Sequence, residues 1–229
     1  MAGMRPDPWQ VRLLASKDRQ MLVLCSRQAG KSTAAAALAL RTALLNPMSP
    51  ILLVSRSRRQ SEELFRKVLE LFRQCGRPLG STLENRLGLE LTNGSRILCL
   101  PGSEATIRGF SGVALLVIDE AARVPDELYY AVRPMLAVSR GRLVALTTPF
   151  GKRGWFYEAW TSESSWQRIE TPATECARIS AEFLDEERRA LGQRWFAQEY
   201  LCSFEDAVGA VFLREDLDAA FDANVKPLF

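Results

Sequence analysis

One short stretch of this chain combines residue types that suit phosphate binding. It is Gly30-Lys31-Ser32, which follows the apolar run at 21–26. Glycine lets the backbone approach a phosphate closely, the lysine ammonium reaches the β- and γ-phosphates, and the serine hydroxyl is a ligand for Mg²⁺. Cys25 stands where the usual pattern has its first glycine. Because that glycine serves the geometry of the turn, its loss leaves the phosphate contacts in place.

A second stretch supplies two adjacent carboxylates. Asp119 and Glu120 end the apolar run at 114–118. An aspartate at the end of a buried strand can hold the ligand shell of Mg²⁺, and a glutamate beside it can orient and deprotonate an attacking water. Either stretch alone is a common pattern, but the two in this order predict an enzyme that hydrolyses a nucleotide with Mg²⁺.

The elements that must position these residues alternate between strands and helices. A hairpin is predicted around Asn93-Gly94, because this dipeptide lies between two alternating apolar runs. Buried strands separated by helices indicate an α/β fold, in which helices cover both faces of a mainly parallel sheet. The predicted strands are 21–26, 51–55, 114–118 and 142–148, and the predicted helices are 31–45, 57–75 and one near 126–138.

The expected order of the strands in the sheet favours one class of nucleotide-hydrolysing protein. The strand at 142–148 is expected between the strand of the glycine-lysine-serine loop and the strand of the two carboxylates, as in the ATPase (ASCE, RecA-like) branch of P-loop proteins. Thr147 and Thr148 then lie beside the γ-phosphate, where a hydroxyl can report whether that phosphate is present. ATP and Mg²⁺ are the expected ligands of this site.

Composition excludes several other kinds of chemistry. The 229 residues contain no histidine, which rules out Ser-His-Asp and Cys-His catalysis and removes the commonest zinc ligand. The apolar runs are too short to span a bilayer. Five scattered cysteines favour reduced thiols over a disulfide framework. Net charge is +3, but residues 1–100 carry +9 and residues 101–229 carry −6, so the first part is the better match for a polyanion.

The pattern changes after about residue 165. Residues 180–204 are amphipathic and helical, with Gly192 as a break between two helices. We therefore divide the chain into a P-loop ATPase core, 1–165, and a small C-terminal helical linker or lid subdomain, 166–229.

Four motifs together resemble the ATPase domain of the large terminase subunit, the DNA-packaging motor of tailed phages. They are "DPWQ", "SRQAGKST", "LLVIDEAARV" and "LTTPFGKRGWFYEAW", and the resemblance covers roughly residues 6–212. That family often carries an arginine in the loop and drops the first glycine, so Cys25 indicates a family variant. The resemblance assigns nucleotide binding to the loop as a whole: Ser26, Arg27, Gln28, Ala29, Gly30, Lys31, Ser32 and Thr33.

The resemblance also implies roles outside the phosphate contacts. Arg27 would contact the γ-phosphate, and Trp9 and Gln10 would bind the adenine. Thr147 and Thr148 would couple hydrolysis to movement. Arg108, in "ATIRGFSG", would be the finger that reaches the ATP of the neighbouring subunit, with Arg140, Arg142 and Arg153 as competing candidates.

By this resemblance, the chain is expected to be a Mg²⁺-dependent ATPase motor that drives double-stranded DNA into a capsid. The implied partners are double-stranded DNA, further copies in a homo-oligomeric ring on the portal, the portal protein and the small terminase subunit. No membrane is involved, and the implied location is the host cytoplasm with transient attachment to the capsid. Candidate DNA-binding residues are Arg56, Arg58, Arg59, Lys152 and Arg153.

The resemblance stops short of the nuclease that usually follows the motor in this family. Few residues come after Phe212, and Asp216, Asp218 and Asp222 are interpreted as solvated charges, so nuclease activity is not expected. An excised domain and a short gene product both remain open.

Two other functions also remain open. A superfamily 2 helicase-like ATPase would require a second ATPase-like lobe, and the chain is too short for one. A non-hydrolysing nucleotide-binding adaptor would have no use for Glu120.

Overall fold

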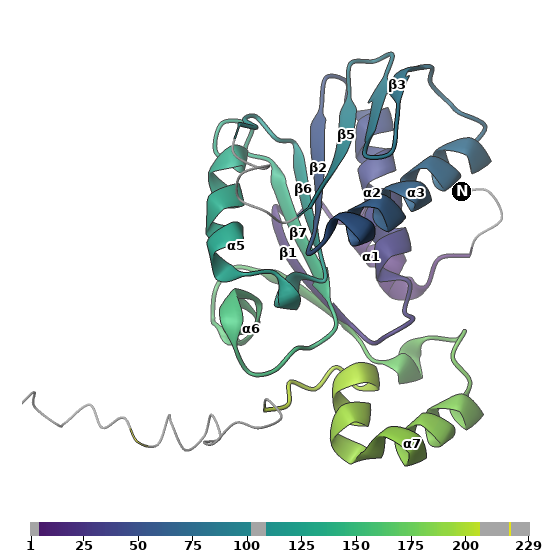
Figure 1. Cartoon of the computed structure of the whole chain (residues 1–229), viewed down its shortest axis with the longest axis vertical. Coiled ribbons are helices and arrows are strands. Elements are labelled where there is room, and N and C mark those ends of the chain that lie inside the picture. Colours follow the sequence, from purple (N-terminus) through teal and green to yellow (C-terminus); the bar gives the residue numbers. More distant parts are fainter. Residues whose placement is uncertain (1–4, 102–108, 207–219, 221–229) are drawn as a thin grey trace, which may run out of the picture.

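In the computed structural model, residues 5–101, 109–206 and 220 are described. They form an eight-stranded sheet with the order β3-β4-β5-β2-β6-β7-β1-β8 (Figure 1). The strands are β1 (Gln20–Cys25), β2 (Pro50–Ser55), β3 (Ser81–Glu84), β4 (Gly88–Leu91), β5 (Arg96–Pro101), β6 (Leu115–Asp119), β7 (Arg142–Thr147) and β8 (Gln167–Thr171). The α-helices are α1 (Pro8–Ala15), α2 (Lys31–Leu45), α3 (Arg58–Gln74), α5 (Asp126–Val132), α6 (Gly154–Thr161) and α7 (Ala181–Tyr200), and the short 3-10 helices are η1 (Ala121–Arg123), η2 (Arg133–Leu136) and η3 (Ala173–Glu175).

The predicted position of β7 is confirmed. It pairs in parallel with β6 on one side and with β1 on the other. The phosphate-binding loop follows β1, and the Asp-Glu pair lies at the end of β6. The carboxyl ends of these three parallel strands therefore meet at one edge of the sheet, where α/β proteins bind their ligands.

Helices cover both faces of the sheet, as the sequence predicts. Successive residues of a buried strand point to opposite faces, so Val23 of β1 packs with the helices α1, α2 and α3, whereas Leu24 packs with α5 and α6. Figure 1 shows α1, α2 and α3 on one side of the strands and α5 and α6 on the other. Both faces of the central strands are consequently dry, which explains their uninterrupted apolar runs.

The antiparallel edge of the sheet follows from local turn chemistry. Asn93 accepts a hydrogen bond from the backbone N–H of Ser95 at 3.0 Å, and Gly94 adopts a φ of +80°. This turn joins β4 to β5 in the predicted hairpin. Ser57 caps the N-terminus of α3, because its hydroxyl accepts from the N–H of Gln60 at 3.3 Å.

The sheet extends beyond the predicted boundary at residue 165. The strand β8 pairs in parallel with β1, so the core continues to Thr171 and the helical segment begins after it. Only a weak pattern in the sequence marks β8, because two of its five residues are buried. Beyond it, α7 lies past one end of the sheet (Figure 1) and contains the predicted break, with Gly192 at φ 73° and ψ 164°.

The helical segment has its own small apolar cluster. Leu184, Phe196 and Tyr200 of α7 pack with Ala173 of η3. This cluster is separate from the two cores of the sheet, so α7 is attached to the rest of the molecule mainly through η3 and through contacts at the phosphate-binding loop. None of the helices in the described part of the chain is long and apolar enough to cross a membrane.

Candidate nucleotide-binding site

The loop between β1 and α2 has the backbone shape that a phosphate requires. Gln28 and Gly30 both have positive φ, at 61° and 87°. The Gly30 carbonyl accepts the first backbone hydrogen bond of α2, from Ala34 at 3.0 Å, so the free N–H groups of the helix N-terminus open directly onto the loop. This arrangement presents a partial positive charge to an anion.

Lys31 is the first residue of α2 and is buried, with 7% of its surface exposed. Its ammonium donates a hydrogen bond to the carbonyl of Ser26, at the other end of the loop, at 3.0 Å. The contact holds the charge inside the curve of the loop, where it can reach a bound phosphate.

Ser32 and Asp119 lie together although 87 residues separate them in the chain. The Ser32 hydroxyl donates to the Asp119 carboxylate at 3.0 Å. Burial raises the pKa of Asp119 above its ordinary value, and the hydrogen bond from Ser32 and the charge of Lys31 oppose this shift. A hydroxyl and a carboxylate oxygen are the kind of ligand that Mg²⁺ prefers, so these two side chains fit the predicted metal role.

Glu120 follows Asp119 in a left-handed conformation, with φ 53° and ψ 43°. A non-glycine residue in this region is strained, and such strain is often found at functional sites. Burial raises the pKa of the Glu120 carboxyl group, while the charges of Lys31 and Arg123 lower it. Arg123 is the nearest ion-pair partner, with its Nε 3.9 Å from a Glu120 oxygen.

Thr147 and Thr148 are buried at the end of β7, between the two motifs. The Thr147 hydroxyl donates to the carbonyl of Thr148 at 2.7 Å and accepts from the N–H of Ala122 at 3.2 Å. Thr147 is thus hydrogen bonded to η1, the helix that directly follows Glu120. The predicted coupling residue touches the predicted catalytic segment.

Arg27 is bound to the helical segment. Its backbone N–H donates to the carbonyl of Glu199 at 2.8 Å, and its guanidinium lies 3.6 Å from the Glu199 carboxylate. Its side chain is 66% exposed. The structure therefore brings Arg27 to the site but pairs it with α7.

The candidate arginine fingers in the described part of the chain lie at different distances from the site. Arg108 lies outside the described residues. Arg142 lies at the start of β7, at the opposite edge of the sheet from the site, where it donates to the carbonyl of Asp18 at 2.9 Å, and Arg140 lies just before it. Arg153 is near the site, with its guanidinium 5.2 Å from the centre of the Phe150 ring.

Trp9 and Gln10, the two residues assigned to adenine binding, have different surroundings in the structure. Trp9 is 4% exposed and belongs to the core between the sheet and the helices, and its indole N–H has no hydrogen-bond partner in the described residues. Gln10, by contrast, lines a cavity of about 200 Å³ together with Thr33 and Arg178. Gln10 is therefore the better placed of the two to contact a nucleotide.

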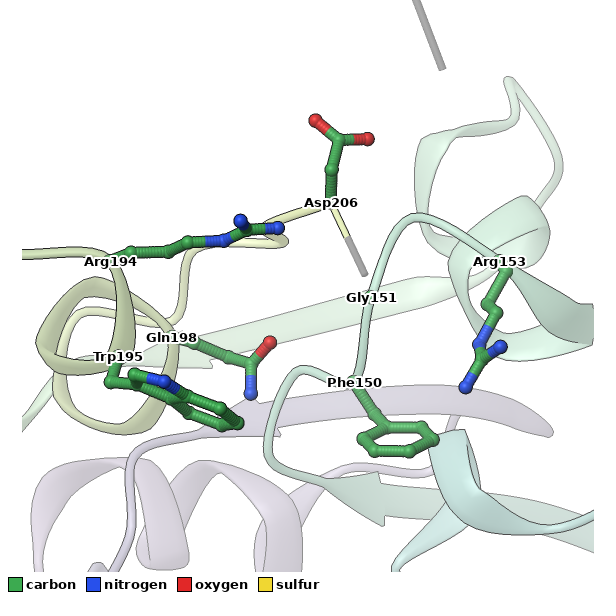
Figure 2. Close-up of a pocket in the computed structure, with 7 residues that line it drawn as sticks. All are labelled: Phe150, Gly151, Arg153, Arg194, Trp195, Gln198 and Asp206. Carbon is green, nitrogen blue, oxygen red and sulfur yellow. The ribbon is translucent and has the colours of Figure 1, made fainter. Parts of the chain in front are cut away.

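A groove of about 160 Å³ lies beyond Thr148, between the loop after β7 and the second half of α7. Figure 2 shows Phe150 and Trp195 on its two sides, with the Gln198 side chain between them and Arg153 directed toward the Phe150 ring. Arg123 lies 4.0 Å from the centre of the same ring. Phe150 therefore lies between Arg123, beside Glu120, and the groove that borders the helical segment.

A comparison with protein families identifies the lineage of this chain. Residues 22–219 match the family model described as "Terminase large subunit, T4likevirus-type, N-terminal". The chain belongs to this family. The resemblance seen in the four sequence motifs is thereby confirmed.

Individual relatives agree with this placement. The large terminase subunits of Thermus phage G20c and Thermus virus P23-45 are each 27% identical over 177 residues. The match covers 69% of this chain and 36% of each relative, so the chain spans about a third of their length.

Solved structures confirm the fold class. The Thermus phage P74-26 large terminase ATPase domain superposes with a TM-score of 0.77 at 22% identity, over 89% of this chain and 96% of that domain. The large terminase of another thermophilic bacteriophage, in complex with ADP, gives a TM-score of 0.71 at 15% identity, over 87% of this chain and 54% of that one.

Three contacts of the site were missed by the sequence analysis. Arg178 and Glu199 bind the loop from the helical segment. Arg178 is 149 residues away in sequence from Ala29, its partner in the loop, and no local sequence pattern indicates such pairings. Arg123 stands in the quoted motif "LLVIDEAARV", three residues after Glu120, a spacing that places the two side chains on one side of a helical turn. That spacing was the available signal.

Proposed function

We propose that this chain is a Mg²⁺-dependent ATPase, the motor domain of a DNA-packaging large terminase subunit. The observation that carries the proposal is the contact between the Ser32 hydroxyl and the Asp119 carboxylate, at 3.0 Å. It joins the phosphate-binding loop to the acidic strand end and places a buried ammonium, Lys31, and a partly buried carboxyl, Glu120, beside them. A structural role for these residues would not require so many charges at one sheet edge.

The chemistry follows from the groups that are present. Glu120 accepts a proton from a water molecule as that oxygen attacks the γ-phosphorus, and the bond from phosphorus to the bridging oxygen breaks to give ADP and phosphate. Lys31 and the N–H groups of the loop stabilise the negative charge on the phosphate oxygens. Ser32 and Asp119 are the residues that would hold Mg²⁺, which would supply positive charge to offset the negative charge of the phosphates. Partial burial raises the pKa of Glu120, which suits a general base.

Contacts of the helical segment support a role as a motor. Glu199 of α7 binds both the backbone and the side chain of Arg27, within the loop that would hold the phosphates. If Arg27 turns toward a γ-phosphate, its ion pair with Glu199 must break. Binding and release of the phosphate would then change how α7 is held against the sheet, which is a route from hydrolysis to movement.

The proposal includes the larger assembly in which such a motor would work. The partners are double-stranded DNA, a homo-oligomeric ring of this chain on the portal, the portal protein and the small terminase subunit, in the host cytoplasm. DNA contact would be made to phosphates. Of the candidate contacts, Arg58 pairs with Glu62 at 3.1 Å on the surface of α3. This pairing favours Arg56 and Arg59 as the more available cations.

The proposal is tested by measuring Mg²⁺-ATP hydrolysis with and without long duplex DNA, in the wild-type chain, in Glu120→Gln and in Glu70→Gln. Glu70 is an exposed carboxylate on α3 away from the site, so its substitution is a matched control. Loss of a general base reduces turnover by roughly 10²–10⁴-fold, so Glu120→Gln should lose activity while still binding ADP, and Glu70→Gln should resemble the wild type. Stimulation by duplex that disappears at high salt would support the DNA motor.

Other outcomes would support the competing functions. ATP binding with no turnover that depends on Glu120, even at high protein concentration, would favour the adaptor. Stimulation only by single strands would favour the helicase-like enzyme.

A further inference from the structure

A cavity beside the phosphate-binding loop has the features of a site for a flat, polar ring. It lies between α1, the first turns of α2 and the chain before α7, with a volume of about 200 Å³. One part of its lining is apolar and includes Leu14, Ala34 and Ala37. The other part carries hydrogen-bonding side chains, namely Arg5, Gln10, Thr33 and Arg178. Thr33 directly follows Ser32, so a nucleotide whose phosphates lie on the loop would direct its base toward this cavity.

Arg178 is held over the loop by two hydrogen bonds. Its Nη2 donates to the carboxylate of Asp7 at 2.6 Å and to the carbonyl of Ala29 at 3.0 Å. Asp7 is 8% exposed, so one partner of this ion pair is nearly buried, while the arginine side chain remains 54% exposed. Because Nη2 is engaged on one edge, the guanidinium is fixed as a plane whose face remains available.

The same arginine lies against the glycine of the loop. A Cβ added to Gly30 would lie 3.2 Å from the Arg178 Nη2 and 2.9 Å from the Gln10 Nε2. The ends of the Arg178 and Gln10 side chains therefore both lie against Gly30, the residue that is predicted to approach the phosphates.

Gln10 has a set orientation. Its Oε1 accepts from the backbone N–H of Asp7 at 3.0 Å, so its amide NH₂ is the group directed toward Gly30. A donor in this position suits a ring nitrogen acceptor at the edge of a base. Asp7 thus positions two polar groups of the cavity, Gln10 through its backbone N–H and Arg178 through its carboxylate.

We propose that Arg178 is a specificity-determining residue that selects a purine nucleotide by stacking its guanidinium on the base. The inference rests on the proposed function, because it assumes that the nucleotide phosphates occupy the loop. Arginine planes stack on nucleobases, and the larger ring of a purine offers more surface to such a plane than a pyrimidine does. The arginine comes from the helical segment, so the identity of the base is read by the part of the chain that also contacts Arg27.

The test compares binding of Mg²⁺-ADP and Mg²⁺-CDP to the purified chain by calorimetry, in the wild type and in Arg178→Ala, Arg178→Lys and Arg189→Ala. Arg189 lies on the surface of the same helical segment and donates only to the carbonyl of Asp185 among the described residues, which makes it a matched control. Stacking on a base is worth an amount that corresponds to about a tenfold change in affinity. Arg178→Ala should therefore weaken ADP binding about tenfold and CDP binding much less.

The lysine variant separates stacking from charge. Arg178→Lys keeps the positive charge but lacks the planar face, so it should lose the preference for ADP as the alanine variant does. Arg189→Ala should keep the wild-type ratio of the two affinities.

Two results would overturn the inference in distinguishable ways. If Arg178→Ala weakens ADP and CDP equally, the arginine has a structural role and the proposed ATPase survives. If the wild-type chain binds neither nucleotide, the proposed function fails together with the inference.

Discussion

Gly30→Ala is the substitution whose cost can be worked out most directly from the structure. Gly30 has φ 87° and ψ 26°, in the left-handed region. A residue with a Cβ pays about 1–2 kcal/mol to adopt this conformation. The new methyl group would also lie 2.9 Å from the Gln10 Nε2 and 3.2 Å from the Arg178 Nη2, both closer than an ordinary contact.

The crowding adds to the backbone cost because neither neighbour is free to move. Gln10 is hydrogen bonded to the N–H of Asp7, and Arg178 is bonded to the Asp7 carboxylate and to the Ala29 carbonyl. Moving either side chain breaks at least one of these bonds, at about 1–2 kcal/mol. We therefore expect Gly30→Ala to lower the free energy of unfolding by about 2–4 kcal/mol in total.

Gly76→Ala separates the two contributions. Gly76 ends α3 with φ +74°, and a Cβ there would meet nothing within 4 Å, so its substitution carries only the backbone cost. The free energy of unfolding measured in urea should therefore be about 1–2 kcal/mol lower for Gly30→Ala than for Gly76→Ala. Gly30→Ala should also lose ADP binding, while Gly76→Ala should keep it. Equal losses of stability in the two variants would show that Gln10 and Arg178 do not pack on Gly30 as described.

Three further predictions concern other parts of the molecule. Burial raises the pKa of Glu120 in the folded chain, so the ionised form of this side chain destabilises the fold. Glu120→Gln should therefore stabilise the protein at pH 7 by on the order of 1 kcal/mol, and this gain should shrink in urea unfolding experiments as the pH is lowered to about 4.3. A gain in stability that does not depend on pH would contradict the assignment. Of the five thiols, Cys75 alone is exposed, so a thiol reagent should label one cysteine rapidly in the native protein and none in Cys75→Ser; a second rapid equivalent would be inconsistent with the burial of the other four. Phe72→Ala should lower the free energy of unfolding in urea by about 3–5 kcal/mol because the ring is fully buried. Leu45→Ala, at an exposed position, should lower it by less than about 0.5 kcal/mol. Similar losses at the two positions would contradict the burial of Phe72 in the core.

The fold could be predicted wherever one periodicity or one turn signal was strong. Dry strands flanked by helices indicated the parallel sheet and its two covered faces, and the Asn93-Gly94 turn marked the antiparallel hairpin. The edge strand β8 was missed because only Ile169 and Thr171 of its residues are buried, so neither an apolar run nor a long alternation marks it. An edge strand gains its stability from a single neighbour, here β1, and that pairing is not visible in local sequence.

The same physics divides the site into a predictable and an unpredictable part. Lys31, Ser32, Asp119 and Glu120 could be located because each lies at or shortly after the carboxyl end of a strand, and parallel strands bring their carboxyl ends to one edge whatever lies between them. Side chains that reach the loop from the helical segment obey no such rule. Arg178, for instance, depends on the path of the chain after β8 and on a carboxylate 171 residues earlier. If the chain is the proposed motor, we expect these contacts to differ most between its nucleotide states, because a segment held by a few polar contacts moves more readily than strands held by buried pairing.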